Sequence, residues 1–104
     1  MQRVHGLNDL LALLAQADGP LEVQSELGAG ASLGALYCRR MIEQAQQAYP
    51  QKPLTVWVDC ADRAGVVLEA LRVGLTHMIV TVPEEVFVKL ADIATQSGAQ
   101  LRRR

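Results

Sequence analysis

The chain has 104 residues, of which half are hydrophobic, and a formal net charge of −1 at pH 7. This length suffices for one compact domain with a core and is too short for two, so we expect a single domain over residues 1–104. Without the three arginines at positions 102–104, seven basic residues stand against eleven acidic ones, a net charge of −4. This acidic body argues against nucleic acid as a partner, because phosphate binding needs a basic face.

Membrane insertion and secretion are both disfavoured by the sequence. No apolar run approaches the roughly 20 residues that a membrane span requires, and the first residues lack the pattern of a secretory signal. Cys38 and Cys60 lie on different predicted elements and show no metal-ligand spacing. Free thiols are typical of a reducing compartment, so we expect a cytoplasmic protein.

The first half of the chain predicts two helices and two strands. Leucines at helical spacing predict a helix over residues 7–17. The alternating stretch "LEVQS" predicts a short strand, and Ser32 is a capping residue for a helix over residues 33–48. The stretch "LTVWVD" is rich in β-branched and aromatic residues. Its nearly continuous apolar run predicts a central parallel strand that is covered on both faces.

The second half repeats this alternation. Asp62 is a capping residue for a helix that reaches Val73 and is closed by Gly74. "THMIVTV" predicts a strand, and Pro83 opens a helix that ends at Gly98. "AQL" predicts a last short strand, and we expect the arginines at 102–104 to form a solvated basic tail; the alternative is that they contact an acidic partner.

The predicted order of elements is α-β-α-β-α-β-α-β. Strands that alternate with helices of this length imply crossover connections and a parallel sheet. The sequence therefore predicts an α/β fold with a four-stranded parallel sheet covered by helices, flavodoxin-like or Rossmann-like.

The glycine-rich stretch "SELGAGASLGA" resembles the dinucleotide-binding fingerprint, in which a strand leads through GxGxxG into a helix. Leu33 stands where the third glycine of that fingerprint is expected, and Asp59 follows 25 residues after Gly34. The resemblance implies a phosphate held at the start of a helix. The alternative is that the glycines only form a tight turn and let the helix pack close to the strand. The candidate cofactor-binding residues are Gly28, Gly30, Ser32 and Gly34.

A second stretch, "ALRVGLTHMIVTVPEEVFVKLADIA", resembles the C-terminal part of receiver domains of bacterial response regulators, which implies a flavodoxin-like sheet. The functional residues of that family do not match. Val82 stands where the family has lysine, and Asp59 stands where it has serine or threonine. Ser25 and Glu26 follow the strand that carries the phosphoacceptor aspartate in the family. The resemblance therefore supports the fold and argues against phosphoryl transfer.

Acidic residues follow the predicted strands at the edge where parallel sheets bind ligands. A phosphate would meet repulsion there, whereas carboxylates can hold a hard divalent cation. The alternative is that these acids only cap helices or occupy first turns. Cys60 has acidic neighbours and no histidine placed to act as a base, which argues against a cysteine nucleophile. The candidate metal ligands are Glu26, Asp59 and Asp62.

The helix over residues 62–73 carries apolar residues on two sides. Leu68 belongs to its predicted inner side, and the opposite side carries Val66, Ala70 and Val73. This second side needs cover, either from the first helix or from another subunit. We therefore expect a small interaction or regulatory module that self-associates through Val66, Ala70 and Val73. The alternative is a protein or enzyme that binds a small ligand or a divalent metal at the acidic strand ends; neither a catalytic set nor a particular cofactor is identified.

Overall fold

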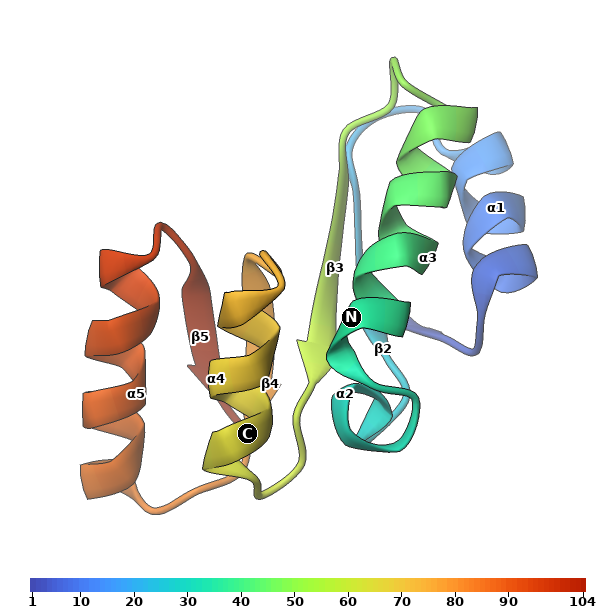
Figure 1. Ribbon diagram of the computed structural model, residues 1–104. Coiled ribbons are helices and arrows are strands. Elements are labelled where there is room, and N and C mark those ends of the chain that lie inside the picture. The colour runs from blue at the N-terminus through green and yellow to red at the C-terminus, as the bar shows by residue number, and fades with distance from the viewer.

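The computed structural model describes all 104 residues, and its strands alternate with helices, with two helices in succession between the second and third strands (Figure 1). The strands are β1 (Arg3–Val4), β2 (Leu21–Ser25), β3 (Leu54–Asp59), β4 (His77–Val80) and β5 (Gln100–Arg103). The helices are α1 (Leu7–Gln16), α2 (Ala29–Ser32), α3 (Ala35–Ala48), α4 (Ala64–Arg72) and α5 (Glu84–Gln96). No helix is both long enough and apolar enough to span a membrane.

The sheet is parallel throughout, and its strands lie in chain order from β1 to β5. The predicted α/β class with a helix-covered parallel sheet is confirmed, with five strands in place of four. The extra strand, β1, has only two residues and is too short to leave a periodic pattern. In flavodoxin-like and Rossmann-like sheets, the order in which successive strands are added reverses at a switch point, and ligands bind there. This strand order contains no reversal, so it differs from both topologies.

The hydrophobic core lies between the helices and one face of the sheet. Because right-handed crossovers that always step in the same direction leave their helices on one side, α1, α3, α4 and α5 share that face, and they lie in front of the strands in Figure 1. One core cluster joins β3 and β4 to α3, α4 and α5, and a smaller one joins β1, β2 and β3 to α1 and α3. The strand residues of these clusters are Val4, Val23, Val56, Val58, Met78 and Val80.

The opposite face of the sheet carries mainly polar residues and no helix packs on it. Trp57 is only 1% exposed there, yet it belongs to neither core cluster. Its Nε1 donates a hydrogen bond of 2.7 Å to Glu22, the Arg102 guanidinium lies 3.9 Å from the ring centroid, and the His77 ring meets it edge-on at 4.9 Å. Burial lowers the pKa of His77. The prediction that helices cover both faces is therefore wrong: charged and polar side chains cover this one.

The arginines at positions 102–104 are part of the sheet. Arg102 and Arg103 belong to β5, and the backbone N–H of Arg104 donates to the Val80 carbonyl at 3.0 Å. The Arg103 side chain donates to the Val82 carbonyl at 2.8 Å. The predicted solvated tail is therefore wrong, because backbone pairing with β4 continues the strand beyond "AQL".

The start of α3 is displaced by two residues from the prediction, and the start of α4 by one. Ser32 ends the short helix α2 and donates to the Gly28 carbonyl at 3.2 Å. Gly34 precedes α3, and Arg63, not Asp62, precedes α4. Neither helix has a side-chain cap, so the capping roles predicted for Ser32 and Asp62 are wrong. Gly74 has a φ of +92° and ends α4 as predicted.

Candidate functional site

A hollow of about 340 Å³ lies at the edge where the strands have their carboxyl ends. It is formed by the turns that follow β2, β3 and β4 together with the residue after β5. Parallel α/β sheets commonly bind ligands beyond this edge. The lining residues are Leu27, Gly28, Asp59, Ala61, Asp62, Thr81 and Arg104.

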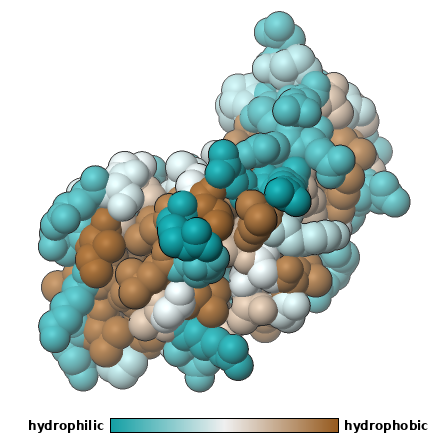
Figure 2. All heavy atoms as spheres, in the orientation of Figure 1, coloured by the Kyte–Doolittle hydropathy of each residue, from teal (hydrophilic) through white to brown (hydrophobic).

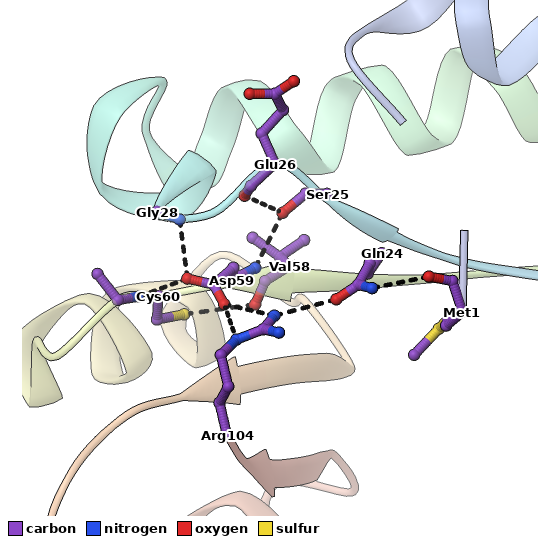
Figure 3. A network of polar contacts seen from close by, with 10 residues as sticks. Met1, Gln24, Ser25, Glu26, Gly28, Val58, Asp59, Cys60 and Arg104 are labelled. Atoms are coloured by element: carbon purple, nitrogen blue, oxygen red, sulfur yellow. Dashed lines mark hydrogen bonds and ion pairs between the residues drawn. The ribbon is translucent and has the colours of Figure 1, made fainter. Parts of the chain in front are cut away.

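The centre of this edge is the carboxylate of Asp59, which is only 2% exposed (Figure 3). Its Oδ1 accepts hydrogen bonds from the backbone N–H groups of Gly28 at 2.8 Å and Ala61 at 2.9 Å. Its Oδ2 accepts from Arg104 Nη2 at 2.9 Å and Nε at 3.1 Å, and the same guanidinium donates to Gln24 at 3.0 Å. A buried charge is stable only when it is paired and hydrogen-bonded, and this carboxylate is both.

The glycine turn closes over Asp59. Gly28 has a φ of +72°, which glycine adopts without strain. A Cβ at Gly30 would lie 3.1 Å from the backbone oxygen of Asp59 and 3.2 Å from the side chain of Val58, so only glycine lets α2 approach β3 this closely. Gly34 has a φ of +91° and leads into α3. The backbone N–H of Gly28 thus binds a carboxylate of the protein itself, at the place where the fingerprint would put a phosphate.

The candidate metal ligands do not converge. No group of three or more histidine, cysteine, aspartate or glutamate side chains is arranged to hold a metal ion. Asp59 is paired with Arg104, Glu26 is paired with His5, and Asp62 is exposed. The structure therefore does not bring the predicted ligands Glu26, Asp59 and Asp62 together, because β5 places Arg104 at this edge and its guanidinium pairs with Asp59.

Both cysteines are free and buried. Burial, together with the nearby Asp59 and Cys38, raises the pKa of the Cys60 thiol to about 12. Burial also raises the pKa of Cys38. The thiolate is the nucleophilic form. Near neutral pH the Cys60 thiol is therefore protonated, which is its poorly nucleophilic form.

Sequence reasoning missed Arg104 and Ala61 as members of this site. Ala61 has a φ of +55°, a conformation that an alanine adopts at a cost, and its backbone joins Asp59 to Thr81. Arg104 was assigned to a tail. The available signal was the direction of the last strand: if "AQL" runs parallel to its neighbours, the residues that follow it reach the same edge as Asp59.

The predicted interface residues are covered within the chain. Ala70 and Val73 are buried in the core, and Val66 lies against Gly30 of α2. The side of α4 that carries Val66, Ala70 and Val73 is therefore covered by other parts of the same chain and not by another subunit. Leu68, assigned to the inner side, is instead 45% exposed. The helix is therefore rotated about its axis relative to the prediction, because the unpredicted α2 covers Val66.

This rotation leaves an apolar surface on the outside of α4 and α5, which pack side by side. Leu68 and Leu71 lie on α4, and Val86 and Ile93 lie on α5, with Ile93 41% exposed. Figure 2 shows hydrophobic residues at the surface over these two helices. These four residues are called the α4–α5 flank below.

Comparisons with known proteins give no assignment: no protein-family model matches the chain, and no curated protein matches it.

Proposed function

We propose that the protein is a small interaction module that self-associates through the α4–α5 flank. The observation that carries this proposal is apolar surface on two neighbouring helices (Figure 2). Leu68 and Ile93 are exposed, and Leu71 and Val86 are partly buried against the core. Leu68 and Leu71 are three residues apart on α4, and Val86 and Ile93 are seven apart on α5, so each pair lies on one side of its helix. Contiguous apolar patches on a protein surface often mark an interface.

A second copy of the chain is the occupant that the charges favour. The net charge is only −1, so two copies repel each other weakly. The charged residues of the two helices have both signs, with Glu69 and Arg72 on α4 and Lys89 and Asp92 on α5. A two-fold interface repeats the same surface on both partners. A two-fold contact through α4 and α5 would therefore bring both positive and negative side chains to the interface, and not charges of one sign only.

The oligomeric state of matched variants tests the proposal. We expect sedimentation to give the wild type a mass of twice the 11.3 kDa chain, and Leu68→Asp to give the mass of one chain, because it places a charge in an apolar contact. Leu36→Asp is the control, since Leu36 is 44% exposed on α3, outside the flank. It should leave the mass of the wild type unchanged.

Two results would contradict self-association through this flank. One is a wild type that sediments as a single chain at every concentration tested. The other is a dimer that persists in both Leu68→Asp and Ile93→Asp, whether or not Leu36→Asp dissociates it. A thermal melt of each variant checks that the substitution has changed association and not folding.

The module is proposed to work in the cytoplasm. Both cysteines are free in the fold, and neither lies in a disulfide framework. Thiols that persist unpaired are typical of a reducing compartment.

The hollow at the carboxyl edge favours a second candidate function, the binding of a small polar ligand. Arg104, Thr81 and Asp62 supply donors and an acceptor around it. We expect a small hydroxy or amino acid to raise the melting temperature by several degrees at about ten times its Kd. Arg104→Gln should abolish that shift and Arg40→Gln, an exposed arginine on α3, should keep it. A panel of such acids that leaves the wild-type melting temperature unchanged would rule out this candidate.

A further inference from the structure

The outer edge of β5 has backbone groups without a partner strand. β5 is the last strand of the sheet and pairs only with β4. The backbone N–H groups of Gln100 and Arg104 donate to Thr76 and Val80, on the β4 side. Because successive N–H groups of a strand point to opposite sides, those of Leu101 and Arg103 point away from the sheet. An unpaired row of this kind is a template for another strand.

The side chains of β5 determine which strand can pair there. Arg102 and Arg103 are exposed, and Arg104 follows them directly. The Arg103 guanidinium has a backbone carbonyl as its partner, so no carboxylate compensates its charge. Arg102 lies 3.9 Å from Glu22, and Arg104 is paired with Asp59. Two copies paired edge to edge would bring their uncompensated Arg103 side chains together, which opposes self-pairing. A strand that carries carboxylates would instead meet opposite charge.

From these two observations we propose that the edge of β5 binds an extended acidic segment of a partner protein by strand addition. Hydrogen bonds to the outward backbone groups of Leu101 and Arg103 supply the affinity, and the Arg103 guanidinium, which has no carboxylate partner, selects the sign of the partner's charge. This inference is independent of the proposed self-association, because β5 and the α4–α5 flank share no residue.

Fluorescence anisotropy with labelled peptides tests the proposal at low salt. The probe is an octapeptide that alternates Glu and Val. One control peptide replaces Glu by Lys, and a second replaces Val by Pro, which keeps the charge, removes every second backbone N–H and disfavours strand pairing. We expect the wild type to bind the Glu-Val peptide at least about tenfold more tightly than either control.

Three protein variants separate the charge from the backbone. Arg103→Gln removes one charge and should weaken binding of the Glu-Val peptide several-fold. Arg103→Pro also removes an outward N–H group and should weaken it more, at a position where an edge strand tolerates proline. Arg40→Gln removes a charge from α3 and should leave the affinity unchanged.

Several outcomes would overturn strand addition at β5. These are no binding of the Glu-Val peptide, equal binding of the Glu-Pro peptide, or equal weakening by Arg40→Gln and Arg103→Gln, which would indicate attraction to the protein's charge in general. The two control peptides are measured with the wild type, so the comparison holds even if Arg103→Pro fails to fold.

Discussion

Trp57→Ala is expected to destabilise the fold by about 3–5 kcal/mol, the range for deleting a buried aromatic side chain. Trp57 is 1% exposed on the sheet face that no helix covers. The substitution removes the ring against which Arg102 and His77 pack, and it leaves Glu22 without its indole donor. Chemical denaturation followed by circular dichroism measures the loss. Trp57→Phe keeps most of the packing and should lose only about 1 kcal/mol for the hydrogen bond, and somewhat more for the smaller ring.

The fluorescence of Trp57 shows what covers it, since it is the only tryptophan in the chain. If Arg102 shields the ring as the structure shows, Arg102→Ala should shift the emission maximum to longer wavelength, as expected for an indole that becomes exposed to water. Arg72→Ala, at an exposed arginine of α4, is the matched control and should leave the emission unchanged. An unchanged emission in Arg102→Ala, or a Trp57→Ala protein as stable as the wild type, would contradict this description of the face.

The sequence predicted most helices and strands because their periodicity is strong. The leucines of α1 and the β-branched run of β3 are local signals, and both elements are present close to their predicted bounds. The number of faces that the helices cover is not a local property. A continuous apolar run such as "LTVWVD" usually indicates cover on both faces. Here Trp57 is buried by Glu22, His77 and Arg102, which come from three other strands, and no single-sequence pattern reports such a contact.

The sequence predicts the acidic residues at the carboxyl edge of the sheet but not the arginine that lies beside them. The acids that follow the strands were visible in the sequence, and Asp59 is indeed at the centre of the edge. The place of Arg104 at this edge was not visible in the sequence. It requires that the strand continue for two residues after "AQL" and that the Arg104 side chain reach from β5 to β3. With the Arg104 guanidinium beside it, the Asp59 carboxylate is part of a buried ion pair and not of an acidic edge suited to a metal ion.

Asp59→Asn is expected to destabilise the fold by about 2–4 kcal/mol, because removing one partner of a buried ion pair leaves the other uncompensated. For a domain of this size that loss lowers the melting temperature on the order of 10–20 °C. The cost lies toward the low end because Asn keeps one oxygen for the N–H groups of Gly28 and Ala61, and because Arg104 is partly exposed to water. Asp62→Asn is the matched control at an exposed neighbour and should leave the melting temperature unchanged.

The double variant Asp59→Asn with Arg104→Gln tests whether the carboxylate acts through this pair. If it does, the two losses are not additive, and the double variant is only slightly less stable than Asp59→Asn alone. A cation site predicts the opposite behaviour: Mg²⁺ or Mn²⁺ would raise the melting temperature of the wild type, and Asp59→Asn would abolish that rise. With the ion pair of the structure, the wild type does not respond to either cation, because Arg104 already neutralises the one carboxylate that the glycine turn encloses.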